Sequence, residues 1–181
     1  MGKIILITGG ARSGKSDFAL KLASGIGGRV VFVATAEPLD DEMKIRIARH
    51  RETRPRDWVT LEVPMNITKK LTGSIRETDT VIIDCLTMLV NNLIYYCTLD
   101  DRQDVSGIER LVEEEVNSLV DLCTSFPANF IIITNEVGSG IVPGDNLSRT
   151  YRDLLGKTNQ NFARHAHEVY LMVSGIPLRI K

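Results

Sequence analysis

Short apolar runs alternate along the whole chain with longer segments in which apolar residues recur at helical spacing. Several of these runs are apolar at nearly every position, which is typical of parallel strands covered by helices on both faces. The alternation predicts an α/β domain with a mostly parallel sheet. The predicted strands span 3–8, 29–34, 58–62, 80–85, 130–134 and 168–175. The final segment "SGIPLRIK" predicts a turn and a short returning strand, antiparallel at the edge of the sheet.

Helical patterns fill the gaps between the strands. The predicted helices span 15–23, 40–51, 109–123 and 146–166, and the polar segment 100–107 is predicted to be an exposed loop. The second helix begins with three consecutive acidic residues, which suit the positive end of a helix dipole. Met43, Ile47 and His50 share one face of this helix, at i, i+4 and i+7, with His50 near its C-terminal end.

The composition fits one catalytic domain covering residues 1–181, since 43% of the residues are hydrophobic and can supply a core. A net charge of −1 argues against nucleic acid or a membrane surface as a partner. Basic residues instead gather between Lys44 and Arg56, where Glu52 is the one acid, and this cluster favours a small anionic ligand. No run is long enough to span a membrane. Three scattered cysteines and an N-terminus unlike a signal peptide predict a cytoplasmic protein.

The segment "GGARSGKS", residues 9–16, matches the pattern G-x-x-x-x-G-K-[ST] and lies between a predicted strand and a predicted helix. In such a phosphate loop (P-loop), backbone N–H groups and the helix N-terminus cradle phosphate oxygens. Lys15 would reach the terminal phosphates, and the Ser16 hydroxyl would bind Mg²⁺. The alternative, a glycine turn without this role, is disfavoured by the strand and helix around it. The pattern predicts a nucleoside triphosphate, but neither its base nor the reaction.

Polar residues follow two other predicted strands. Asp84 ends the strand "TVIIDC" and would hold Mg²⁺ or its water, unless it only caps a loop. Thr134, Asn135 and Glu136 lie where strand ends meet ligands in open α/β sheets. The alternative for these three residues is a tight connection without a functional role.

The segment "RIARHRETRPRDW", residues 46–58, surrounds one histidine with arginines. From the residues alone, His50 is either a helix-end histidine that interacts with the dipole or a nucleophile beside a bound anion. The nearby positive charges would favour the neutral imidazole that a nucleophile requires. His165 and His167 lie near another helix end without a metal-binding pattern, and we interpret both as structural.

Five segments together resemble one family: "TGGARSGKS", "ATAEPLDDEM", "RIARHRETRP..W", "TNEVGSGIVP" and "VSGIPLRIK", in this order. The family is that of the bifunctional adenosylcobinamide kinase/adenosylcobinamide-phosphate guanylyltransferase. The resemblance covers essentially the whole chain. The P-loop alone is unspecific, but the histidine segment together with "NEVGSGIVP" is highly specific.

The resemblance implies a P-loop NTPase fold, with a RecA-like, mostly parallel sheet, helices on both faces and one antiparallel edge strand. It also implies a homotrimer. Such enzymes phosphorylate adenosylcobinamide with ATP or GTP. They then transfer GMP from GTP to adenosylcobinamide phosphate through a guanylylated histidine, giving adenosyl-GDP-cobinamide and pyrophosphate. Mg²⁺ is the implied cofactor, with Ser16 and Asp84 as its candidate ligands.

The family's histidine falls on His50, and Lys15 is the second candidate catalytic residue. Some members carry two histidines where this chain has Arg49 and His50, and some have Glu in place of Asp84, so contact of Asp84 with metal or with ribose stays open. The implied nucleotide contacts fall on Gly9, Gly10, Ala11, Arg12, Ser13, Gly14, Lys15, Ser16, Ala34, Thr35, Ala36, Arg51, Glu52, Thr53, Arg54, Glu62 and Asp84.

Two other functions fit parts of the pattern. A plain P-loop kinase would use Lys15, Ser16 and Asp84, with His50 only as a binding residue. A nucleotide-dependent switch would not need the arginine and histidine cluster. The bifunctional reading also raises a geometric question, because a P-loop presents the γ-phosphate whereas guanylyl transfer requires attack at the α-phosphate. Either the helix that carries His50 moves or the nucleotide binds in two poses.

Overall fold

The computed structural model describes residues 2–99 and 105–181, which form one seven-stranded sheet in the order β3-β2-β4-β5-β1-β6-β7. All neighbouring strands are parallel except β6 and β7. The strands are β1 (Ile4–Gly9), β2 (Val30–Ala34), β3 (Val59–Glu62), β4 (Thr80–Asp84), β5 (Asn129–Ile133), β6 (Glu168–Val173) and β7 (Ile176–Arg179). The predicted strands and the antiparallel edge strand are therefore confirmed.

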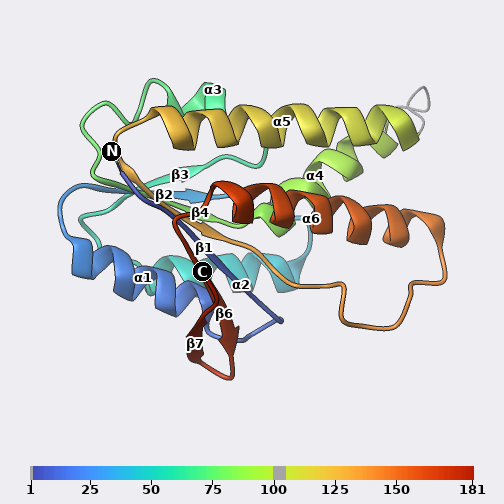
Figure 1. Cartoon of the computed structure of the whole chain (residues 1–181), viewed down its shortest axis with the longest axis horizontal. Coiled ribbons are helices and arrows are strands. Elements are labelled where there is room, and N and C mark those ends of the chain that lie inside the picture. The colour runs from blue at the N-terminus through green and yellow to red at the C-terminus, as the bar shows by residue number, and fades with distance from the viewer. Residues whose placement is uncertain (1, 100–104) are drawn as a thin grey trace.

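Helices cover both faces of this sheet (Figure 1). The helices α1 (Lys15–Ile26) and α2 (Asp41–Glu52) lie on one side, and α4 (Leu86–Thr98), α5 (Val105–Ser125) and α6 (Asn146–His165) lie on the other. The short α3 (Ile67–Leu71) packs beside α5. Within the described residues, none of the helices combines the length and the apolar character needed to cross a bilayer.

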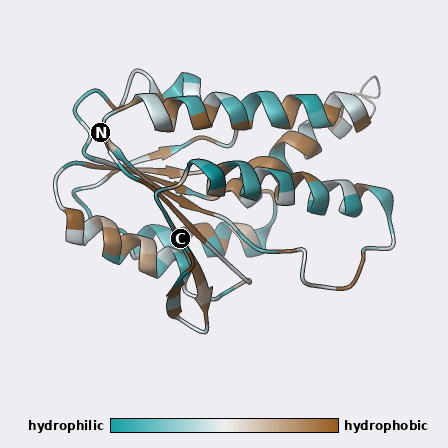
Figure 2. Ribbon diagram, viewed as in Figure 1, coloured by the Kyte–Doolittle hydropathy of each residue, from teal (hydrophilic) through white to brown (hydrophobic). Residues whose placement is uncertain are grey.

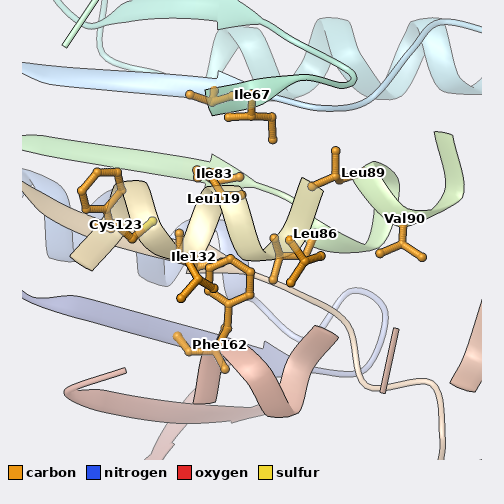
Figure 3. Packing of buried hydrophobic residues seen from close by; sticks show 14 of the residues in the cluster. Ile67, Ile83, Leu86, Leu89, Val90, Leu119, Cys123, Ile132 and Phe162 are labelled. Carbon is orange, nitrogen blue, oxygen red and sulfur yellow. The ribbon is translucent and has the colours of Figure 1, made fainter. Parts of the chain in front are cut away.

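Alternation along the strands divides the core into two clusters. In β2, Val31 and Val33 face the cluster beneath α4, α5 and α6, whereas Val30 and Phe32 face the cluster beneath α1. The central strands are hydrophobic along their length, and the helices turn hydrophilic residues outward (Figure 2). Figure 3 shows how the larger cluster places Ile83 and Ile132 of the sheet with residues such as Leu86, Leu119 and Phe162. The parallel strands thus bring their carboxyl ends to one edge of a rigid sheet.

Three helical features differ from the sequence prediction. Helix α4 was not predicted, because eight of its residues are buried on several sides and its apolar positions show no clear face. The five-residue α3 is too short to produce a periodic pattern. The predicted loop 100–107 is wrong for 105–107, since α5 begins at Val105 and its polar residues lie on the exposed side of an amphipathic helix. Residues 100–104 lie outside the described part of the chain.

Candidate functional site

The P-loop, Gly9–Ser16, follows β1 and passes directly into α1 at Lys15. Gly9 and Gly14 both have positive φ angles, of 145° and 91°. A Cβ atom at Gly9 would lie 2.6 Å from the backbone oxygen of Met172 on the neighbouring strand β6. Glycine is therefore required at Gly9 for two reasons, backbone conformation and space. This turn aims the first N–H groups of α1 at the carboxyl edge of the sheet.

Lys15 lies inside this loop. Its side chain is buried, and Nζ donates hydrogen bonds to the backbone oxygens of Gly9 (3.1 Å) and Gly10 (2.6 Å) and to Ser13 Oγ (3.4 Å). Burial is the main cause that lowers the pKa of Lys15. The ammonium group is thus held at the concave side of the loop, where phosphate oxygens can replace the backbone acceptors.

Ser16 and Asp84 are brought together from α1 and the end of β4. The Ser16 hydroxyl donates a hydrogen bond to Asp84 Oδ2 at 2.9 Å. Burial raises the pKa of Asp84, and the Ser16 hydrogen bond and the positive charges of His50, Arg54 and Lys15 oppose this rise. Asp84 is therefore a half-buried carboxyl group among cationic side chains. A hydroxyl next to a carboxylate is the ligand pair that P-loop enzymes use for Mg²⁺.

The described residues contain no group of three or more histidine, cysteine or acidic side chains that could hold a metal. Mg²⁺ usually takes one or two protein ligands and fills its remaining positions with water and substrate phosphates. The donor set formed by Ser16 and Asp84 is of that kind.

Thr35 ties β2 to β4 beside the site. Its Oγ1 donates to the backbone oxygen of Cys85 (2.8 Å) and accepts from the Cys85 N–H (2.7 Å). Asn92 of α4 donates to the Thr35 carbonyl at 2.8 Å. The Thr35 side chain is fully buried, and its hydrogen bonds fix the backbone next to Asp84. Ala34 and Ala36 flank it at the sheet edge; Ala34 is buried and Ala36 is half-buried.

His50 lies on the face of α2 that was predicted from the spacing of apolar residues. Met43, Ile47 and His50 are half-buried, and the other described residues of α2 are exposed. The Asp40 carboxylate begins the helix by accepting a hydrogen bond from the Met43 N–H at 2.7 Å. The positive charge that His50 can carry acts on Asp84, so the inner face of α2 lies within electrostatic reach of the P-loop.

The arginines after His50 have separate environments. Arg51 forms an ion pair with Glu62 at the end of β3. The Arg54 guanidinium lies 3.9 Å above the centre of the Phe32 ring, and its Nε and Nη1 are buried without a hydrogen-bond partner among the described residues. Buried donors of this kind are costly unless an acceptor binds them. A cavity of about 570 Å³ opens here and is lined by Arg51, Arg54, Pro55, Arg56, Trp58, Thr60 and Glu62.

The remaining candidate nucleotide-binding residues are mostly exposed. Glu52 and Thr53 are exposed at the end of α2, and the Thr53 hydroxyl donates to the His50 carbonyl at 2.9 Å. Ala11 and Arg12 are exposed, and Ser13 is half-buried, along the outer turn of the P-loop.

Two of the three polar residues after β5 connect elements of the fold. Thr134 donates to Asn159 of α6 at 2.7 Å, and the Asn135 N–H donates to Thr87 Oγ1 at 2.8 Å. Glu136 is exposed, and its carboxylate accepts the N–H of Gly138 at 2.6 Å. Thr134 and Asn135 therefore link β5 to α6 and α4, as expected from the alternative interpretation of this segment as a tight connection.

His165 and His167 both take part in structural hydrogen bonds. His165 Nδ1 lies 2.9 Å from the Asn161 carbonyl within α6. The His167 ring accepts the Ile4 N–H at 3.0 Å through Nδ1, and the backbone N–H of His167 donates to the Ile4 carbonyl. Ile4 is the first residue of β1 and lies at the end of this strand opposite the P-loop.

Asn92 is a residue of the site that the sequence analysis missed. It is buried within α4, and its side-chain amide holds both the Thr35 carbonyl and, at 3.2 Å, the Pro64 carbonyl. It thereby joins α4 to the loops that follow β2 and β3. The pair of asparagines inside the apolar run "MLVNNLI" was the signal that could have indicated a buried polar contact.

Comparisons with known proteins agree with this geometry. The family model described as "Cobinamide kinase / cobinamide phosphate guanyltransferase" matches residues 5–180. The bifunctional adenosylcobalamin biosynthesis protein CobU of Escherichia coli strain K12 is 41% identical over 98% of this chain and 99% of its own length. The corresponding protein of Salmonella typhimurium, also named CobU, is 40% identical over the same shares of both chains. CobP of Pseudomonas aeruginosa, with the same description, is 38% identical over 97% of this chain and 96% of its own.

A solved structure supports the fold. The crystal structure of the RadB recombinase superposes with a TM-score of 0.50, covers 94% of this chain and 74% of its own, and is 14% identical. This similarity shows the RecA-like fold alone. The family model and the full-length relatives together show that the chain belongs to the cobinamide kinase / cobinamide phosphate guanyltransferase family.

Proposed function

We propose that the chain phosphorylates adenosylcobinamide with ATP or GTP and then transfers GMP from GTP to the adenosylcobinamide phosphate through a guanylyl group on His50. The observation that supports this proposal is the complete P-loop, in which Lys15 is buried and the Ser16 hydroxyl donates to Asp84, together with a half-buried His50 on α2. Family membership supplies the substrates.

The kinase step uses the P-loop. Backbone N–H groups of the loop and the Lys15 ammonium bind the β- and γ-phosphates, and Ser16 and Asp84 are the residues that would hold Mg²⁺. Mg²⁺ would neutralise charge that develops on the transferred phosphoryl group. The alcohol of the substrate attacks the γ-phosphorus, and the nucleoside diphosphate leaves. Phosphoryl transfer of this kind depends mainly on positioning and charge neutralisation, which this loop provides.

The guanylyl step uses His50 as nucleophile. The lone pair of the neutral imidazole attacks the α-phosphorus, the bond to the bridging oxygen breaks, and pyrophosphate leaves with the electron pair. An oxygen of the adenosylcobinamide phosphate then attacks the same phosphorus, and the lone pair returns to the imidazole. Arg54 offers buried donors without a partner, and we assign them to an oxygen of the bound nucleotide.

The two steps require attack at different phosphorus atoms. None of the described residues from Asp41 to Glu52 is buried, so α2 is held to the body by few apolar contacts. Weak packing supports movement of α2 between the two steps. The other arrangement that serves both reactions is a second pose of the nucleotide.

The assembly and the compartment belong to the same proposal. Exposed apolar residues on the last hairpin, Val173, Ile176, Leu178 and Ile180, support self-association, which we assign to a homotrimer. The three scattered cysteines of the sequence, none of them in a C-x-x-C pair, support the reducing cytoplasm.

Product analysis tests the proposal. The chain is incubated with adenosylcobinamide, ATP, GTP and Mg²⁺, and the corrinoids are separated by chromatography and weighed by mass spectrometry. We expect adenosylcobinamide phosphate followed by adenosyl-GDP-cobinamide in the wild type, and only the phosphate in His50→Ala. If the wild type accumulates only adenosylcobinamide phosphate, the result would support a plain P-loop kinase instead. If the nucleotide is hydrolysed without any corrinoid product, the result would support the nucleotide-dependent switch.

A further inference from the structure

The last hairpin of the chain, dark red in Figure 1, has a tight turn that lies against the P-loop. The turn consists of Ser174 and Gly175, which join β6 to β7 with φ angles of 50° and 83°. Positive φ angles at both central residues are typical of a type I′ turn, which suits the twist of a β-hairpin. The Gly175 N–H donates a hydrogen bond to the Ser13 carbonyl of the P-loop at 3.0 Å.

The hairpin and the P-loop are also packed closely. A Cβ atom at Gly14 would lie 3.1 Å from the Cα atom of Gly175, which is tighter than an ordinary van der Waals contact. The hairpin therefore touches both P-loop glycines that have positive φ angles, Gly9 through Met172 of β6 and Gly14 through Gly175. The shape of the P-loop and the position of the hairpin depend on each other.

Burial of apolar surface does not account for the position of this turn. All four residues of β7 are exposed, and so are Ser174 and Gly175. The hairpin beyond β6 thus adds little to the hydrophobic core. What the turn does contact is the backbone of a phosphate-binding loop, through the hydrogen bond to Ser13 and the close approach to Gly14.

The hydrogen bond from Gly175 fixes the orientation of the peptide between Ser13 and Gly14. This peptide is trans, so its C=O and N–H groups point in opposite directions. Since Gly175 holds the Ser13 carbonyl toward the hairpin, the Gly14 N–H points away from the hairpin. Within the described part of the chain, the Gly14 N–H donates to no acceptor. It is therefore free for a ligand, as the N–H groups of a P-loop must be.

We propose that Gly175 is a positioning residue of the phosphate site, which holds the Ser13 carbonyl and thereby keeps the Gly14 N–H aimed at a phosphate oxygen of the bound nucleotide. This inference rests on the proposed function only in that the P-loop binds the triphosphate. Gly175 touches neither substrate nor reacting atoms and acts through the Ser13–Gly14 peptide. A donor that is already oriented needs no reorganisation when the nucleotide binds, so loss of the turn weakens binding.

The first test compares two glycines with similar backbone strain and different positions. Gly27 has a φ angle of 75° and, like Gly175, would have no atom within 4 Å of an added Cβ atom. It follows the last residue of α1, at the opposite end of this helix from the P-loop. Valine is disfavoured at positive φ, so Gly175→Val and Gly27→Val should both lower the thermal unfolding midpoint.

Only the variant at the turn should lose affinity for the nucleotide. Binding is measured by calorimetry with a GTP analogue that has a methylene group between the α- and β-phosphorus atoms and cannot guanylylate the protein. Gly175→Val should weaken binding about tenfold, as expected for the loss of one hydrogen bond. Gly27→Val should stay within about twofold of wild type, because it lies far from the loop. Equal affinities in the two variants would overturn the proposal.

A conservative variant at the same position checks that the backbone conformation is the cause. Asparagine tolerates positive φ and keeps the N–H, so Gly175→Asn should bind the analogue within about threefold of wild type. Binding as weak as in Gly175→Val would contradict the role of the turn.

The second test asks whether the lost affinity concerns the phosphates. Inorganic tripolyphosphate shares only its phosphates with the nucleotide, and its inhibition constant is measured by competition with the analogue. This constant should also rise about tenfold in Gly175→Val, because the same N–H group is lost to both ligands. An unchanged inhibition constant would overturn the assignment to the Gly14 N–H.

These outcomes separate the inference from the proposed function. If the wild type does not bind the analogue, the P-loop function fails and the inference fails with it. If the wild type binds it and forms both corrinoid products, while Gly175→Val matches Gly27→Val, the proposed function stands and the inference fails. Where a valine variant does not fold, Gly175→Ala and Gly27→Ala provide the same comparison with less strain, and equal affinities overturn the proposal there too.

Discussion

Lys15 and His50, the two candidate catalytic residues, are held in opposite ways. Lys15 is buried and bonded to the loop that it serves, and its neighbours Ser16 and Asp84 are joined across α1 and β4. His50 is half-buried on a helix of which no described residue is buried. The P-loop is thus fixed to the sheet, whereas the candidate nucleophile lies on a weakly packed helix.

This difference suits an enzyme that carries out two reactions. The P-loop takes part in both steps, so a rigid setting suits it. His50, as the candidate nucleophile, would act in one step only. A rigid P-loop next to a weakly held helix therefore suits the two reactions, and variants of the P-loop and of α2 should behave differently.

The largest expected effect is on Lys15. We expect Lys15→Met to slow both phosphorylation and guanylylation by about 1,000-fold, because each reaction loses the cation at the centre of the P-loop. His50→Ala should abolish guanylylation and leave phosphorylation within about threefold of wild type. The measurement is the rate of each reaction in the two variants. Guanylylation at the wild-type rate in Lys15→Met would show that Lys15 does not serve both reactions.

The next largest effect is expected for the backbone of the P-loop. Gly9→Ala places a Cβ atom against Met172 at a positive φ angle and should destabilise the fold by roughly 3 kcal/mol. Gly10→Ala is the matched control, because a Cβ atom there would contact nothing within 4 Å. Urea unfolding of both variants checks the prediction. Equal midpoints for the two would show that the loop is less tightly held than the structure indicates.

A smaller effect is expected where Thr35 joins β2 to β4. Thr35→Val keeps the shape but leaves the Cys85 N–H without its partner and removes one of the two donors to the Cys85 carbonyl, which should cost about 2 kcal/mol of stability. Because Asp84 precedes Cys85, the Mg²⁺ concentration needed for half-maximal phosphorylation should also rise. Thr35→Ser retains the hydroxyl and should behave almost as wild type. An unchanged Mg²⁺ requirement in Thr35→Val would mean that Thr35 does not help to position Asp84.

The smallest effect is expected in α2. Asp40→Ala removes the N-cap and should weaken the helix by about 1 kcal/mol. Because no described residue of α2 is buried, we expect roughly fivefold faster hydrogen exchange within α2 and little change in the global unfolding midpoint. Hydrogen exchange followed by mass spectrometry measures this locally. A drop in the global midpoint matching the loss in α2 would show that the helix unfolds together with the sheet.

Local patterns predicted most of the fold and part of the site. The strands follow from short apolar runs, and the inner face of α2 follows from the spacing of Met43, Ile47 and His50. The P-loop follows from a pattern with a known backbone shape. Helix α4 was missed because it is buried on several sides, so its apolar residues do not alternate with polar ones at helical spacing.

The contacts that complete the site depend on which strands become neighbours. Thr35 reaches Cys85 only because β2 lies beside β4, and Arg54 stacks on Phe32 only because the chain after α2 folds back over β2. Neither contact leaves a local signal, since the partners are separated in the sequence.

The central claim is that His50 carries the guanylyl group, and intact-protein mass spectrometry tests it most directly. The wild type and His50→Ala are incubated with GTP and Mg²⁺, with binding of GTP confirmed for both. We predict a mass gain of one guanylyl group (GMP less one water) in the wild type, lost in acid as expected for a phosphorus–nitrogen bond, and no gain in His50→Ala. A wild type that binds GTP without gaining this mass, or a His50→Ala variant that still gains it, would contradict the account.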